Sequence, residues 1–173
     1  PGGTRGCNPS MWGENGVLSR DGERDISNMV VDSGASRHMS ANQDWFEDLR
    51  PVRDEHVHMG NGSTMRILGV GTINFRVKSR DGVDVTLSLQ DAQYVPDMQN
   101  SSNLFSIGAA MRKGASINIA QDDCYLEVPG GIQIPLVQHG SILTMEGHAH
   151  EEGGTTRDER VLQPTRREEQ HVI

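Results

Sequence analysis

Two stretches that alternate polar and apolar residues around an Asp-Gly pair constrain this chain more than any other feature of its sequence. They span residues 72–78 and 83–89, and Asp81-Gly82 lies between them. A period of two places alternate side chains on opposite faces of a strand. Glycine accepts the positive φ that a tight turn requires. The pattern therefore predicts an antiparallel β-hairpin with one buried face.

Short apolar runs elsewhere in the chain predict further strands. One lies over residues 27–31, directly before Asp32, and a Pro-Gly-Gly turn at 129–131 separates two others. Turn signals recur about every ten residues, which is typical of a small β barrel or sandwich. The runs in the second half of the chain are Ile117–Ile119, Tyr125–Val128 and Ile132–Ile134.

One short helix is expected after residue 106. Ser106 has the side chain of an N-cap, and Gly114 is a typical helix terminator. Phe105, Ile107 and Met111 are interpreted as core residues of this segment. The fold class is therefore all-β with one short helix.

Composition excludes several classes of protein. The chain has 16 Lys+Arg and 24 Asp+Glu, so its net charge is −8, which argues against a nucleic-acid-binding surface because phosphates attract a basic one. No run approaches the ~18 consecutive apolar residues of a membrane span. The two cysteines, Cys7 and Cys124, form no metal framework and at most one disulfide. They fit a reducing compartment.

The apolar residues are concentrated in the middle of the chain. Residues 27–145 hold six of the seven aromatic residues and nearly all the Val, Ile and Leu, and they are expected to form the folded domain. Residues 1–26 and 146–173 are rich in charge and poor in apolar side chains. We expect a flexible N-terminal linker and a disordered charged tail, because neither segment can bury enough surface to offset its ordering entropy.

The candidate chemistry lies in the segment Asp32-Ser33-Gly34-Ala35, which follows the first apolar strand. The strand would hold the Asp32 carboxylate on rigid backbone, and the Ser33 hydroxyl could donate a supporting hydrogen bond. Gly34 would let the backbone approach the carboxylate closely, and Ala35 keeps the adjoining space clear.

The small residues after Asp32 leave room for a second copy of the same loop to face it. Two facing carboxylates share one proton, so that one can deprotonate water while the other protonates a leaving group. Only one Asp-Ser-Gly occurs in the chain. A second Asp32 would have to come from a second subunit.

Four ordered motifs give the chain a known likeness. From Val30 to Asp123 it resembles the retropepsin-like aspartic protease of copia-type retrotransposon Gag-Pol polyproteins. The motifs are Asp32–Met39, Met59–Ser63 with Ile67–Gly71, Asp91–Pro96, and Asn103–Gly108 followed by Lys113–Ile117.

This resemblance implies a small closed acid-protease barrel that acts as an obligate homodimer. It implies an aspartic endopeptidase that needs neither metal nor cofactor and cleaves the element's own polyprotein peptides. Asp32, Ser33 and Gly34 would be the catalytic residues. The protein would be cytoplasmic, inside virus-like particles, with no membrane or nucleic-acid partner.

A flap over the substrate is expected some thirty residues after Asp32. Asn61-Gly62 is a strong two-residue turn signal, and a glycine-rich hairpin there could bend over a bound peptide. The peptide would add to the sheet as an extended strand. Gly60, Asn61, Gly62, Ser63 and Ala35 are the expected substrate-binding residues.

Structural alternatives stand beside each assignment. Asp32 could simply cap a turn, and Asn61-Gly62 could be a plain surface hairpin. His56 and His58 lie two apart, as on one strand face, but are interpreted as solvated histidines. Arg37 could pair with an acid beside the active loop or across a dimer.

Three functions remain open on this sequence. The first is the active homodimeric aspartic endopeptidase. The second is a catalytically silent, domesticated β domain that serves as a dimerisation or peptide-binding module. The third is an unrelated structural β domain in which Asp32 has no chemical role.

Overall fold

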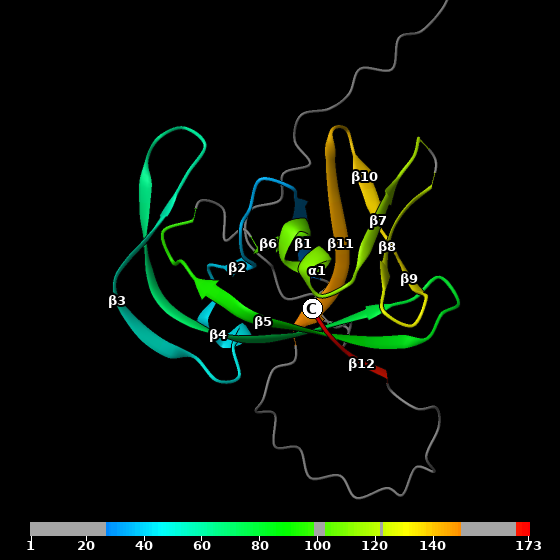
Figure 1. Ribbon diagram of the computed structural model, residues 1–173, viewed down its shortest axis with the longest axis horizontal. Helices are drawn as coiled ribbons and strands as arrows, with labels where there is room; N and C mark the ends of the chain where they lie inside the picture. The colour runs from blue at the N-terminus through cyan, green and yellow to red at the C-terminus, as the bar shows by residue number, and fades with distance from the viewer. Residues whose placement is uncertain (1–26, 99–102, 122, 150–168) are drawn as a thin grey trace, which may run out of the picture.

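The computed structural model describes residues 27–98, 103–121, 123–149 and 169–173 (Figure 1). The expected linker at 1–26 and most of the expected tail lie outside these residues. The elements in chain order are β1 (Ser27–Asp32), β2 (Met39–Ser40), the 3-10 helix η1 (Gln43–Trp45), β3 (Arg50–His58), β4 (Thr64–Lys78), β5 (Asp84–Tyr94), β6 (Asn103–Ser106), α1 (Ile107–Arg112), β7 (Ser116–Ile119), β8 (Cys124–Val128), β9 (Ile132–Pro135), β10 (Val137–His139), β11 (Ile142–Ala149) and β12 (Glu169–Val172).

The main sheet closes on itself. Its strands follow the order β10-β11-β1-β6-β2-β5-β4-β3, and an additional antiparallel pairing joins β11 to β4, with His148 opposite Arg76. The strands β11-β1-β6-β2-β5-β4 therefore form a closed ring, in which each strand pairs with a neighbour on both sides. The prediction of an all-β barrel with one short α-helix in the described residues is confirmed.

The alternating sequence forms the hairpin it predicts. β4 and β5 pair antiparallel from Ile73–Leu89 to Lys78–Asp84, and Gly82 turns the chain with a φ of +76°. Side chains of β4 alternate between buried and less buried positions from Ile67 to Val77. The period of two in the sequence is thus the period of burial in the fold.

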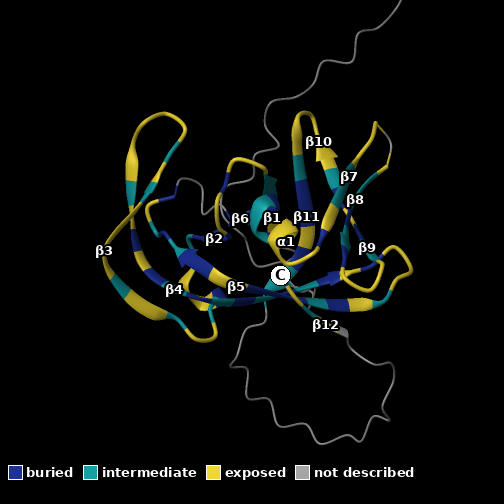
Figure 2. Cartoon of the chain, viewed as in Figure 1, coloured by how far each residue is buried: buried dark blue, intermediate teal, exposed yellow. Residues whose placement is uncertain are grey.

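The buried side chains form two clusters (Figure 2). The larger fills the barrel and includes Phe75, Phe105 and Met145, each fully buried. The smaller contains Ala35, Met39, Ile67, Val95 and Met98 and is joined by partly buried residues of the β3–β4 hairpin. The second cluster therefore ties that hairpin to the loop that follows β1.

The helix begins where the sequence predicts. The Ser106 hydroxyl accepts a hydrogen bond from the Ala109 N–H at 3.0 Å, and Gly114 follows the helix with a φ of +90°. Phe105 and Ile107 are buried as expected. The core assignment of Met111 is wrong, because its side chain is 57% exposed. A helix of six residues has room for one buried stripe, and Ile107 and Ala110 occupy it.

The predicted strands of the second half form a separate sheet. β7, β8 and β9 pair antiparallel in that order, and the turn at 129–131 contains Gly130 and Gly131 at positive φ. Leu126 and Ile134 of this sheet are buried in the main core. The sheet thus caps the barrel rather than forming a domain of its own.

The expected tail is wrong in its two described parts. β11 continues to Ala149, and β12 adds to β5 as a parallel strand with Glu169 opposite Val85. Ile173 is 1% exposed in the main core. The average composition of 146–173 is polar, but the segment ends in two β-branched residues, Val172-Ile173. Such residues favour a strand, and here they lie at the end of the pairing of β12 with β5. The outer domain boundaries otherwise stay a prediction.

Within the described residues, no helix has the length and apolar character that a membrane crossing demands.

The first prediction tests the pairing of β11 with β4 that closes the barrel, at Gly147 of β11. A Cβ there would collide with the backbone oxygen of Arg76 and with the Phe75 ring, 2.7 Å away. Gly147→Ala should therefore lower the free energy of unfolding by about 1–3 kcal/mol, as overpacking does. Denaturant melts would measure it. Gly60→Ala is the matched control, because a Cβ at Gly60 meets nothing within 4 Å. Equal stability of the two variants would contradict the closure.

Candidate active site

Asp32 lies at the end of β1 with a half-buried side chain. Its Oδ1 accepts a hydrogen bond from the Gly34 N–H at 2.7 Å. A Cβ at Gly34 would lie only 3.3 Å from the same oxygen, so the glycine permits the close approach that the sequence predicts. This one contact suits a reactive carboxylate and a capping one equally well. The surroundings of the loop must distinguish them.

Strand pairing fixes the position of Asp32 on both sides. β1 lies between β11, antiparallel, and β6, parallel, and the parallel register sets Asp32 opposite Ser106. In Figure 1 the loop after β1 and the start of α1 accordingly lie together. The carboxylate is therefore carried by a central strand of the barrel, which restricts its movement.

Three residues form the hydrogen bonds that hold the loop after Asp32 in place. The Ser106 hydroxyl donates to the Ala35 carbonyl at 2.6 Å, and the Ser106 N–H donates to Nδ1 of His38 at 3.1 Å. The Arg112 guanidinium donates to the Ser36 carbonyl at 2.9 Å. Ser106 and His38 are buried. We call Ser106, His38 and Arg112 the loop clamp.

His38 is the one titratable group of the clamp with a strongly shifted pKa. Burial, with a smaller contribution from the positive charge of Arg112, lowers the pKa of His38 from 6.5 to about 4. The ring is neutral at physiological pH. Because Nδ1 accepts the Ser106 N–H, the ring hydrogen must be on Nε2. Nε2 is buried and has no hydrogen-bond partner among the described residues.

The other residues of the predicted catalytic segment differ in their environments. Ser33 is exposed and makes no hydrogen bond to another described residue, so its supporting role stays a prediction. Ala35 is buried in the smaller cluster, 8% exposed, together with Ile67 of β4. Ala35 thus belongs to a buried cluster that also contains a residue of the hairpin and does not line open space.

The predicted flap residues form the turn between β3 and β4. The Gly62 N–H donates to the Met59 carbonyl at 2.9 Å, and Asn61 Oδ1 accepts from the N–H and the hydroxyl of Ser63. Gly62 has a φ of +83°. Figure 1 shows the hairpin tip and the loop after β1 rising on the same side of the molecule. In the described residues no hydrogen bond joins the tip, from Gly60 to Ser63, to that loop.

Metal-ligating side chains do not gather anywhere in the described part of the chain. His56 and His58 are both exposed on β3. Arg37 is exposed and has no ion pair with a described residue, so the acid predicted beside the loop is not found there. Its pairing across a dimer stays a prediction. The site therefore offers a carboxylate on a supported loop and no ligand set for a metal.

Sequence reasoning missed the loop clamp. The sequence indicates Ser106 only as a helix cap and indicates no separate role for His38 or Arg112. The Ser106 contact to Ala35 joins residues 71 positions apart, and it depends on the parallel pairing of β1 with β6. Local patterns carry no signal for that pairing.

Comparison with known proteins gives one family. The family model described as Pol polyprotein, beta-barrel domain matches residues 29–115, half of the chain. The match begins in β1 and ends just after α1, so it contains Asp32, the hairpin and the loop clamp. Searches of curated proteins and of solved structures return no match.

The second prediction concerns the pH dependence of stability. Because the pKa of His38 is lower in the folded chain than its value of 6.5, the unfolded chain binds the proton first as the pH falls. Stability present above pH 6.5 should be lost toward pH 4, by about 3 kcal/mol at most. His38→Asn keeps an acceptor for Ser106 and should flatten this loss. Unfolding midpoints across that range measure it.

Exposed His56 provides the control, since His56→Asn should leave the curve unchanged. Parallel stability curves for wild type and His38→Asn would contradict the assignment of this pH dependence to His38.

Proposed function

Since the chain belongs to the Pol polyprotein, beta-barrel domain family of retroelement polyproteins, we propose that it is the retropepsin-like aspartic endopeptidase of a copia-type element. The observation that carries the proposal is Asp32 itself. It stands at the end of a central strand, in an Asp-Ser-Gly segment whose loop the clamp holds by three hydrogen bonds. A simple turn cap needs no such support from α1 and β6.

The proposed enzyme is a homodimer with one Asp32 from each subunit. The chain has a single Asp-Ser-Gly, and Asp32 lines neither the pocket of about 460 Å³ nor that of about 240 Å³ in one copy. A peptide cleft between two copies accounts for both facts. Ser33 and Gly34 are exposed, which leaves this face available to a second copy.

The proposed reaction is hydrolysis of a peptide bond without a covalent intermediate. The ionised Asp32 takes a proton from water, whose oxygen attacks the carbonyl carbon. The protonated Asp32 of the other subunit transfers its proton to the carbonyl oxygen, so that a neutral tetrahedral diol forms. A proton then passes to the amide nitrogen, the C–N bond breaks, and the acid and amine products leave.

The proposed substrate is an extended segment of the element's own polyprotein. The β3–β4 hairpin supports this, because its turn residues Gly60–Ser63 are exposed. The N–H groups of Gly60 and Asn61 donate to no described residue, unlike those of Gly62 and Ser63, and can donate to an added strand. Ala35 and Ile67 of the hairpin belong to one buried cluster, which links the position of the hairpin to the loop after Asp32. Closure of the hairpin over the peptide would exclude water from the dyad.

The third prediction is loss of cleavage on Asp32→Asn. The substitution is nearly isosteric and removes the proton-accepting carboxylate, so turnover of a mixed peptide library should fall by at least about a thousandfold. Fold and dimer should persist, as judged by circular dichroism and sedimentation. Asp81→Asn, in the exposed turn between β4 and β5, is the matched control and should keep activity.

The pH and concentration dependence extend this test. Activity should be greatest from acidic to near-neutral pH, where one proton is shared, and should fall faster than linearly on dilution as dimers dissociate. Cleavage that survives in Asp32→Asn would contradict the mechanism. A folded wild-type dimer that cleaves nothing at any pH would instead identify a silent dimerisation or peptide-binding module.

A further inference from the structure

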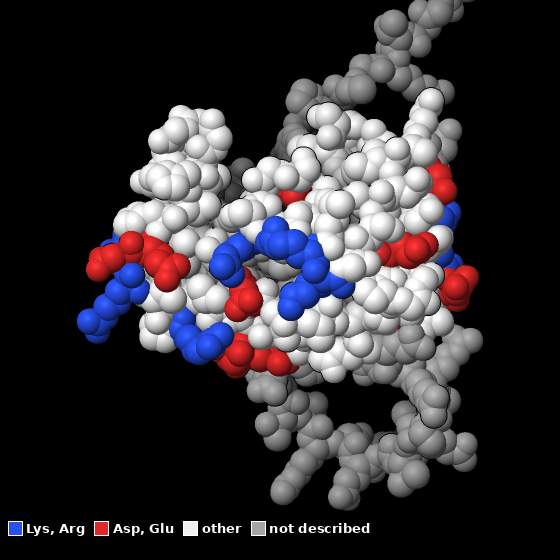
Figure 3. Space-filling model, viewed as in Figure 1, with Lys and Arg blue, Asp and Glu red and all other residues white. Residues whose placement is uncertain are grey.

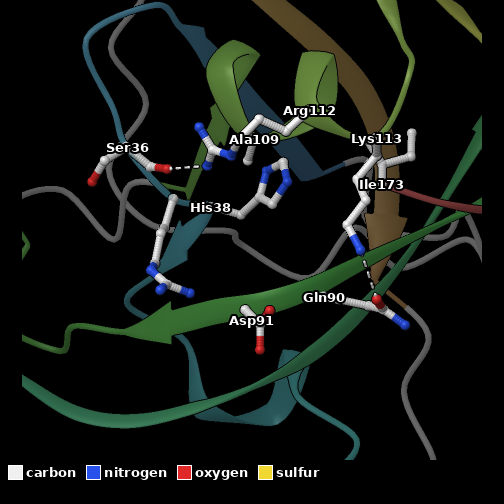
Figure 4. A pocket seen from close by; sticks show the side chains of 9 residues that line it. Ser36, His38, Gln90, Asp91, Ala109, Arg112, Lys113 and Ile173 are labelled. Atoms are coloured by element: carbon white, nitrogen blue, oxygen red, sulfur yellow. Dashed lines mark hydrogen bonds between the residues drawn. The ribbon is translucent and has the colours of Figure 1, made fainter.

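A basic pocket adjoins the loop clamp, and two members of the clamp, His38 and Arg112, line it. It has a volume of about 460 Å³ and is formed by the loop after Asp32, the end of α1 and the middle of β5 (Figure 4). Arg37, Arg112 and Lys113 contribute three cationic side chains to its wall, against one acidic side chain, that of Asp91. Figure 3 shows Lys and Arg side chains in an arc around a hollow in this face.

This excess of positive charge stands out on an acidic chain with a net charge of −8. Arg37 makes no ion pair with a described residue, and Lys113 contacts only the neutral Gln90, at 3.3 Å. Three cations that face one cavity repel one another at short range unless an anion enters. The described residues supply one acidic side chain there, that of Asp91, and no ion pair between described residues joins it to any of the three.

The wall also contains an N–H donor without a partner. His38 lines the pocket, is 1% exposed, and has its Nε2 hydrogen unsatisfied within the described residues. Its ring contacts Phe105 at a centroid distance of 4.9 Å, which offers no acceptor. A buried donor without an acceptor costs about 1–3 kcal/mol. An oxygen that enters from the pocket would remove this penalty.

A β-bulge shapes the opposite wall. Thr72 of β4 faces two residues of β5, Gln90 and Asp91, because the register shifts between Gly71 and Ile73. Asp91 takes a φ of +55°, which is uncommon for a residue other than glycine. Both bulge residues line the pocket. Strained bulges of this kind concentrate near functional sites, where they redirect side chains.

We infer that this pocket binds a carboxylate side chain of an acidic peptide segment. The cations and the His38 N–H select an acceptor with negative charge. The volume far exceeds that of one small anion, and Ala109 and Ile173 add apolar wall. Ile173 directly follows β12, and its main-chain oxygen accepts from the Gln90 N–H at 3.0 Å, so extended backbone already runs along β5 to the pocket edge.

The inference is independent of the proposed catalysis, because the pocket does not include Asp32. Full-length Asp32→Asn protein is the material for the test, since it cannot consume the probe by the proposed mechanism. The probe is a fluorescein-labelled hexapeptide that alternates glutamate with alanine, and its partner carries glutamine in place of glutamate. Anisotropy titrations measure both peptides.

The glutamate peptide should bind at least about tenfold more tightly than the glutamine peptide and should weaken between about 50 and 300 mM salt. Adding Arg37→Gln and Lys113→Gln should weaken its binding about tenfold, the loss expected for two exposed charges. Both side chains are exposed, so the fold is retained. Lys78→Gln, which removes one exposed cation paired with Asp84, is the control and should change little.

A second readout locates the ligand. The His38 Nε2 resonance in ¹⁵N-labelled protein should shift when the glutamate peptide is added, and that of exposed His56 should not. Equal binding of the two peptides, no detectable binding, or insensitivity to the Arg37 and Lys113 substitutions would overturn the inference. Tighter binding of inorganic phosphate or a single-stranded oligonucleotide, lost in the same double variant, would also overturn it and identify a phosphate site.

Discussion

The site depends on one pairing, that of β1 with β6 as parallel neighbours. This pairing sets Asp32 opposite Ser106, and the same serine then begins α1, supports the Ala35 carbonyl and donates its N–H to His38. Parallel strands need a long connection between them. Here the connection contains β3, β4 and β5, so strands of the barrel wall separate the two halves of the candidate site along the chain.

Much of the fold could be predicted because its signals are local. The alternation around Asp81-Gly82 predicts the β4–β5 hairpin, Ser106 and Gly114 bound the helix, and the apolar runs from 117 to 134 predict β7, β8 and β9. What could not be predicted depends on distant contacts. β12 and the burial of Ile173 rest on an edge of β5 some 80 residues earlier in the chain, and composition alone predicted a tail.

The candidate site likewise has one part that follows from local sequence and another that depends on distant contacts. The Asp32–Gly34 contact lies within three residues and follows from the Asp-Ser-Gly sequence. The clamp and the basic pocket join the loop after β1 to α1 and to the bulge in β5. The two features share that loop: Ser36 accepts from Arg112, and Arg112 and His38 both line the pocket. An acidic peptide in the pocket would therefore contact two residues, His38 and Arg112, that also hold the proposed catalytic loop.

The central claim is that catalysis requires two Asp32 carboxylates, one from each subunit. Mixing wild-type chain with Asp32→Asn chain at constant total concentration tests it most directly, once subunits have exchanged. Only wild-type pairs would be active, so activity should follow the square of the wild-type fraction and fall to about one quarter in an equal mixture. A linear dependence, with about half the activity remaining, would show that one Asp32 suffices and would contradict the account.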